Sequence, residues 1–267
     1  MVEGNLTSIR LGRGRITILP TVKGLTRERR KVREAVDKVG PDAIALPVSL
    51  EGLRGLRAVN RGVEPEIFLS HYEEIYALKL SRFGKVAVPP PSYTEAYAVS
   101  TEKKIPVLAI DMSEKEFANA FCEDVSGTNL VYHSIRWRWL KRKSFREAAD
   151  AGQFVLAWDR AVNSLKGFRN LEGRREEHMA RRLLGLSQKY KNILAVLEME
   201  RMEGVVRRLG SPTTTPLYEE EGLEEEEENG EGGAQAEGGQ KKGGRAAKTE
   251  REEKIGERGT EAEGEEE

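Results

Sequence analysis

The order of apolar and polar positions near the N-terminus predicts a strand, a helix and a second strand. Arg15–Leu19 is a β-branched apolar run that ends at the turn-forming stretch Pro20–Gly24. Four apolar residues then follow between residues 32 and 39 at the i, i+3, i+4, i+7 spacing of a helix with one buried face. Gly40-Pro41 is expected to end this helix, and Ala43–Val48 is a second apolar run.

Two buried strands joined by a helix are normally parallel and connected by a right-handed crossover. Ligands of such βαβ units lie beyond the carboxyl ends of the strands. The residues that follow the two strands, Pro20–Gly24 and Pro47–Leu50, are therefore the first place to look for a functional site.

The remaining pattern alternates strands and helices, which predicts an α/β fold with a central mixed β-sheet flanked by helices. Further strands are expected at Leu6–Leu11, Lys85–Val88, Ile105–Ile110 and Asn192–Leu197, the first joined to Arg15–Leu19 by a turn at Gly12–Gly14. Further helices are expected at Pro65–Gly84, Ser92–Lys103, Ser113–Phe121, Ser144–Trp158, Gly173–Tyr190 and Gly204–Leu209, with a loop at Glu123–Leu130. The segment Leu53–Gly62 reads as short and amphipathic or irregular.

The charge of the chain is divided unevenly along its length. Residues 217–267 contain 19 acidic and 7 basic side chains, a net charge of −12, whereas residues 1–216 contain 37 basic and 26 acidic ones, a net charge of +11. The acidic end is rich in Glu and Gly and poor in large apolar residues, so it cannot bury enough surface to offset the entropy of ordering. We therefore expect an α/β domain over residues 1–210 and a disordered acidic tail over residues 211–267.

Several classes of protein do not fit this composition. No apolar stretch approaches the ~20 residues of a membrane span, and no signal-peptide pattern is present at the N-terminus. The single cysteine, Cys122, excludes an internal disulfide framework and favours a cytoplasmic location. The charged fraction of 33% is also typical of thermophilic, including archaeal, proteins.

Familiar catalytic and metal-binding motifs are not found in the sequence. The three histidines, His71, His133 and His178, are not spaced as metal ligands, so no metal and no cofactor is expected. Neither a Gly-x-Ser-x-Gly elbow nor a phosphate-binding glycine loop occurs. Asp111 directly follows the predicted strand Ile105–Ile110, where it would either face a site or start the next helix.

A basic and aromatic segment, Ile135–Arg146, is a second candidate site. Stacking aromatic rings together with cations is how proteins hold single-stranded nucleic acid, and a similar pattern occurs at membrane interfaces. A buried helix with a solvated basic face is the structural alternative. The residues that would contact nucleic acid are Arg136, Trp137, Arg138, Trp139, Lys141, Arg142 and Lys143.

Several short motifs resemble, in the expected order, those of the TraB/PrgY (pheromone-shutdown) family, which is grouped with ChaN-like, GumN-like and Tiki proteins. The similar stretches together span residues 5–210. They are Ile16–Lys23, Val39–Leu46, Ile105–Asp111, Arg175–Leu183 and Ile193–Gly204. The resemblance implies an α/β fold with a site formed by Thr21, Asp111, Arg175 and Gly204.

The chain departs from the family where the resemblance would place metal ligands. Lys23 stands where the family has a histidine, and Glu198–Arg201 replaces its Gly-x-Gly-His motif. In Tiki-like relatives these motifs are associated with metal-dependent hydrolysis. A cationic side chain offers no lone pair to a metal and repels it, so the resemblance implies a domain that has lost this chemistry.

The leading hypothesis is a non-catalytic binding or regulatory module, with Lys23, Arg175 and Arg201 forming a cationic pocket for an anionic small molecule or peptide. The nearby Glu198 and Glu200 would instead neutralise Lys23 and Arg201 if the cluster is only structural. A metal-dependent, peptidase-like hydrolase with an atypical site and a nucleic-acid-binding module are the alternatives. The sequence leaves a homo-oligomer open.

Overall fold

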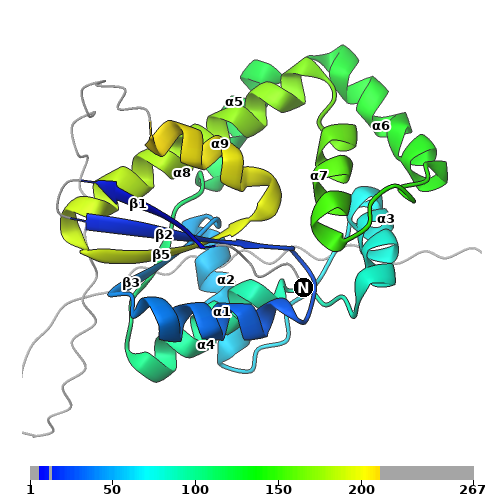
Figure 1. Cartoon of the computed structure of the whole chain (residues 1–267). Helices are drawn as coiled ribbons and strands as arrows, with labels where there is room; N and C mark the ends of the chain where they lie inside the picture. The colour runs from blue at the N-terminus through cyan, green and yellow to red at the C-terminus, as the bar shows by residue number, and fades with distance from the viewer. Residues whose placement is uncertain (1–5, 12–13, 211–267) are drawn as a thin grey trace, which may run out of the picture. The chain divides into compact units, whose positions relative to one another are not determined.

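The computed structural model describes residues 6–11 and 14–210, and this part of the chain has an α/β fold (Figure 1). Within these residues a five-stranded mixed β-sheet is combined with nine α-helices. Gly12 and Arg13 of the predicted first turn, and the acidic tail predicted for residues 211–267, lie outside the described residues.

The sheet has the strand order β1-β2-β5-β3-β4, and only β1 is antiparallel to its neighbour. The strands are β1 Thr7–Leu11, β2 Gly14–Thr21, β3 Ala43–Leu46, β4 Val107–Ala109 and β5 Asn192–Glu198. The predicted βαβ unit is β2-α1-β3, but β5 is inserted between its two strands. The carboxyl ends of the four parallel strands therefore meet at one edge of the sheet.

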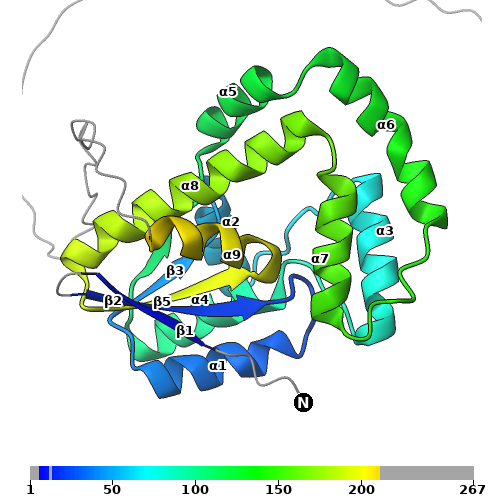
Figure 2. The same cartoon turned by 45° about the horizontal axis from the view of Figure 1, so that its top comes forward.

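Helices cover both faces of the sheet, as the two views in Figures 1 and 2 show. Their bounds are α1 Glu28–Val39, α2 Leu50–Asn60, α3 His71–Leu80, α4 Pro91–Lys103, α5 Glu114–Asp124, α6 Gly127–Arg142, α7 Ala151–Val162, α8 Lys166–Lys189 and α9 Met199–Leu209. Helices α1, α2 and α4 share one hydrophobic core with the sheet, and α8 and α9 share the core on the opposite face. Burial of β-strands on both sides accounts for their continuous apolar runs.

A third hydrophobic cluster holds α3, α6 and α7 together beyond the strand ends. Its centre is Phe154 of α7, whose ring contacts those of Phe145 and Phe83. Val22 and Leu25, which follow β2, belong to the same cluster. The chain directly after β2 thus connects the sheet to this helical group.

Local sequence signals located some helix ends correctly and misplaced others. Gly40 takes the left-handed conformation expected after α1, and Ser113 forms the predicted capping box with Glu116. The helix expected from Pro65 begins only at His71, because Ser70 and Glu73 form a capping box there. Residues 127–130, expected in a loop, are the first turn of α6.

The helix predicted to start at Ser144 begins at Ala151 instead. Asp150 caps it by accepting a hydrogen bond from the backbone N–H of Gln153. The segment from Leu53, left open as irregular, is most of α2, which Ser49 caps through the N–H of Gly52. In the part of the chain that is described, no helix is both long and apolar enough to cross a bilayer.

Candidate functional site

A cavity of about 700 Å³ opens at the carboxyl edge of the sheet. Its walls are mainly apolar and aromatic side chains from α2, α3, α4 and α7, among them Leu56, Val59, Tyr72, Tyr76, Tyr93 and Trp158. Charged side chains at its polar end are Lys23, Asp159, Glu172, Arg175, Glu198 and Glu200. Apolar walls with a few converging polar groups are typical of small-molecule sites.

Glu198, the last residue of β5, is the centre of the polar end. Its Oε1 lies 3.2 Å from Lys23 Nζ and accepts a 2.9 Å hydrogen bond from the hydroxyl of Tyr93. Burial opposes ionisation, but the charges of Lys23 and Arg175 outweigh it and lower the pKa of Glu198 to about 2. Glu198 is therefore a carboxylate at neutral pH.

Lys23 is the cation most open to the cavity. Its side chain is 47% exposed, and its only ion-pair partner among the described residues is Glu198. The backbone carbonyl of Lys23 accepts a hydrogen bond from the Tyr76 hydroxyl, which fixes the turn after β2. The Glu198 charge raises the pKa of Lys23 in spite of burial, so the ammonium persists.

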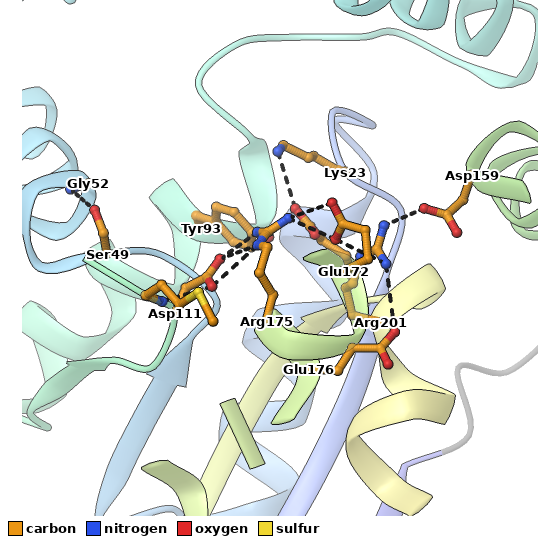
Figure 3. A network of polar contacts seen from close by, with 12 residues as sticks. Lys23, Ser49, Gly52, Tyr93, Asp111, Asp159, Glu172, Arg175, Glu176 and Arg201 are labelled. Atoms are coloured by element: carbon orange, nitrogen blue, oxygen red, sulfur yellow. Dashed lines mark hydrogen bonds and ion pairs between the residues drawn. The ribbon is translucent and has the colours of Figure 1, made fainter. Parts of the chain in front are cut away.

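Arg175 projects from α8 to the end of β4, where it contacts Asp111. Its Nε lies 3.2 Å from Asp111 Oδ2, and its Nη1 lies 3.0 Å from Glu172 Oε2 (Figure 3). Asp111 also accepts a hydrogen bond from the N–H of Met112. Asp111 thus fastens α8 to the sheet edge and, unlike Arg175, does not line the cavity.

Arg201 is buried among three carboxylates and does not reach the cavity. It pairs with Asp159 of α7, with Glu172 at 3.1 Å and with Glu176 at 3.6 Å, and its side chain is only 7% exposed (Figure 3). Burial lowers its pKa, but these charges, Glu172 first, prevail and raise the pKa. Arg201 links α7, α8 and α9 as a structural ion-pair centre.

Two further predicted residues also have structural roles. Thr21 is fully buried, and its hydroxyl donates a 3.1 Å hydrogen bond to the carbonyl of Leu197 in the neighbouring strand β5. Gly204 lies against Glu176: a Cβ at this position would lie within 2.6 Å of both carboxylate oxygens. Glycine at this position leaves room for the Glu176 carboxylate between α8 and α9.

Glu200, in the first turn of α9, differs from its charged neighbours. Its Oε2 is inaccessible to solvent and has no hydrogen-bond partner among the described residues. Burial, followed by the negative charge of Glu198, raises the pKa of Glu200 to about 8. At neutral pH the cavity therefore contains a neutral carboxylic acid beside an ionised one.

The predicted candidates therefore divide into two groups. Lys23 and Arg175 line the cavity together with Glu198 and Glu200, whereas Thr21, Asp111, Arg201 and Gly204 do not. Sequence reasoning missed Tyr93, Asp159 and Glu172, which lie on three different helices. These three residues are far from Glu198 in the sequence, so no sequence motif could have indicated that they lie beside it.

The donor set does not fit a divalent metal. No cluster of three or more His, Cys, Asp or Glu side chains within residues 6–11 and 14–210 is suited to hold an ion. Of the carboxylates that line the cavity, Glu198 pairs with Lys23, Glu172 with Arg175 and Arg201, and Asp159 with Arg201, and these cations repel a metal ion.

The nucleic-acid candidates lie on and just after α6, where the two tryptophans face different surroundings. Trp137 packs against the third hydrophobic cluster and lies 4.5 Å, centroid to centroid, from the ring of His71. Trp139 is 51% exposed. The basic residues around them are Arg136, Arg138, Lys141, Arg142 and Lys143.

No protein-family model matches the chain, and a search of curated proteins gave no significant match.

Proposed function

We propose that this chain is a degenerate TraB-like domain that acts as a non-catalytic binding module for a small ligand with one anionic group. The single observation that carries the proposal is the cavity at the carboxyl edge of the sheet, with Lys23 opening into it. Such an edge is where α/β folds bind ligands. The TraB-like resemblance supports the same edge, because its similar stretches Ile16–Lys23 and Ile105–Asp111 both end just after a parallel strand there.

The charge balance of the polar end limits the ligand to a single anionic group. Arg201 is enclosed by carboxylates, and most of the guanidinium of Arg175 is used by Asp111 and Glu172. The Lys23 ammonium forms one ion pair, with Glu198, and its remaining N–H groups are free to donate hydrogen bonds into the cavity. A carboxylate or phosphate at Lys23, with Arg175 beside it, is the arrangement that these side chains favour.

The apolar walls of the cavity determine the size and polarity of the rest of the ligand. Leu56, Val59 and Trp158 offer apolar surface, and the volume of about 700 Å³ suits an organic molecule of moderate size. A peptide with a free terminal carboxylate and apolar side chains would satisfy the same chemistry. The proposal includes no metal-dependent step, since the described residues of the polar end offer no donor set for a metal.

Isothermal titration calorimetry with straight-chain carboxylates, from acetate to dodecanoate, tests the proposal. The matching primary alcohols are the uncharged controls. We expect affinity to rise with chain length by about 0.8 kcal/mol for each buried CH₂ until the cavity is full. Carboxylates are expected to bind at least about tenfold more tightly than the alcohols, as expected for a charge-assisted hydrogen bond.

A charge-neutral double variant, Lys23→Met with Glu198→Gln, separates binding from folding. It removes the cation and its partner together, so no buried charge is left alone. We expect it to lose the preference for carboxylate over alcohol, whereas Lys85→Met, at an exposed site outside the cavity, keeps it. Equal affinity for acids and alcohols in the unmodified chain, or an unchanged preference in the double variant, would overturn the proposal.

A further inference from the structure

Helix α6 presents a row of apolar side chains to solvent. Val131, Tyr132, Ile135 and Trp139 are 67%, 54%, 52% and 51% exposed. Ile135 follows Val131 and Tyr132 by four and three residues, and Trp139 follows Ile135 by four, so all four side chains share one face of α6. We call these four residues the α6 stripe.

The opposite face of α6 is anchored in the body of the protein. Leu140 is fully buried and Trp137 partly buried in the cluster with Phe154, and Tyr72 of α3 donates a hydrogen bond to the carbonyl of His133. Figures 1 and 2 both show α6 at the edge of the described part, with α3 and α7 on its inner side. The α6 stripe is therefore held facing outward by a packed inner face.

Basic side chains border the α6 stripe on both sides. Helical geometry places Arg138 along one border and Arg136 along the other, and it places Arg142 at the end of the stripe, in line with Val131 and Ile135. Lys143 directly follows the helix. Arg136 and Lys143 lie 5.4 and 4.8 Å from the ring of Trp139. No acidic residue occurs between positions 125 and 146, so none of these charges is neutralised within the helix.

The chemistry of the α6 stripe favours lipid over nucleic acid. Aliphatic Val131 and Ile135 gain nothing from a phosphate backbone or a stacked base, but they are stabilised among acyl chains. Only Trp139 and Tyr132 are open for stacking, because Trp137 is packed inward. Tyr and Trp at headgroup level, with Arg and Lys reaching outward, are the pattern of helices that lie in a membrane interface.

We propose that the outer face of α6 binds the surface of bilayers that contain anionic lipids. The α6 stripe enters the boundary between headgroups and acyl chains, and the four bordering basic residues contact the lipid phosphates. This surface lies on a helix that contributes no residue to the cavity lining, so the proposal stands independently of the cavity ligand.

Co-sedimentation of the full chain with vesicles tests this proposal. Vesicles of phosphatidylcholine containing 30% phosphatidylserine are compared with vesicles of pure phosphatidylcholine. We expect binding to the anionic vesicles only, with a steep loss when the salt concentration is raised. Trp139→Phe should abolish the blue shift of tryptophan fluorescence that accompanies binding of the unmodified chain.

Two variants divide the interaction into its apolar and charged parts. Ile135→Ser with Trp139→Ser should lower vesicle binding at least tenfold, and Arg138→Gln with Arg142→Gln should lower it about 25-fold, about fivefold per charge. Val63→Ser and Arg29→Glu alter equally exposed sites away from α6 and should bind as the unmodified chain does. All substituted side chains are at the surface, and unchanged circular dichroism confirms that the variants fold.

Three results would contradict the proposal. Equal binding to neutral and anionic vesicles would show that the basic residues beside the α6 stripe do not contribute to binding. Vesicle binding that survives both α6 variants would place the contact elsewhere. Binding to a single-stranded oligonucleotide but not to anionic vesicles, lost in the same variants, would assign the surface to nucleic acid.

Discussion

The hydroxyl of Tyr93 in α4 donates a hydrogen bond to Glu198 at the end of β5, 105 residues further along the chain. Lys23 approaches the same oxygen, Oε1, from the turn after β2. Through its contacts with Tyr93 and Lys23, the Glu198 carboxylate connects α4, on one face of the sheet, to the ends of β5 and β2. Glu198 is therefore both a wall of the cavity and a fastening of the fold.

Tyr93→Phe should lower the free energy of unfolding by about 1.5–3 kcal/mol, the usual effect of removing a hydrogen bond to a buried charge. Because the pKa of Glu198 is lower in the native state than unfolded, its stabilisation is complete above about pH 4.5 and is lost toward pH 2. The variant should therefore unfold at a higher pH in acid titrations followed by circular dichroism. Tyr97→Phe, one turn along the same helix, is the control, since its hydroxyl has no described partner.

Arg201→Leu should destabilise the protein by about 3–5 kcal/mol, because the partly buried Asp159, Glu172 and Glu176 lose their shared cation and Asp159 keeps no other ion-pair partner among the described residues. Adding Asp159→Asn should recover part of the loss, and urea denaturation measures both. Arg207→Leu, exposed on the same helix, should change stability by less than about 0.5 kcal/mol. Equal effects at the two arginines would refute a structural role for Arg201.

The raised pKa of Glu200 predicts that the free energy of unfolding falls as the pH rises. Its ordinary pKa is 4.5 and its native pKa is about 8, so between these values the unfolded chain releases a proton that the native state retains. Glu200→Gln should abolish this trend, and its advantage over the unmodified chain should grow by at most about 1.4 kcal/mol per pH unit. Urea denaturation from pH 5 to 8.5 tests this, with Glu203→Gln as the matched control in α9. Parallel curves for all three proteins would show that Glu200 is ionised throughout.

Much of the fold was predictable because its signals are local. Each buried strand is a continuous apolar run, and the turn chemistry at Gly40 and Ser113 marked where two helices end and begin. The capping pattern at Ser144 was misleading because Asp150 offers a competing cap six residues later. A short cap motif decides a helix boundary only when the segment behind it can also be packed.

The site was predictable only as far as the strand ends. The predicted strand ends correctly indicated that Lys23 and Glu198 lie at the same edge of the sheet. Their ion pair is part of the structural alternative described for the cluster. In the structural alternative Glu200 would help to neutralise Lys23 and Arg201, but its Oε2 has no described hydrogen-bond partner. The partners of Arg201 depend on how α7 and α8 pack against α9, which no spacing in the sequence encodes.

The contact between α8 and α9 at Gly204 can be tested with one substitution whose effect on stability should change sign between two backgrounds. In the unmodified chain Gly204→Ala forces the Glu176 carboxylate away from Arg201 and Arg208, and we expect a loss of about 1–3 kcal/mol. In a Glu176→Ala background the three atoms nearest to the new Cβ are gone, and the same substitution should stabilise the protein by about 0.5–1 kcal/mol through helix propensity. Guanidinium denaturation of the four proteins gives the coupling energy. A loss of the same size in both backgrounds would mean that backbone approach, and not Glu176, requires the glycine.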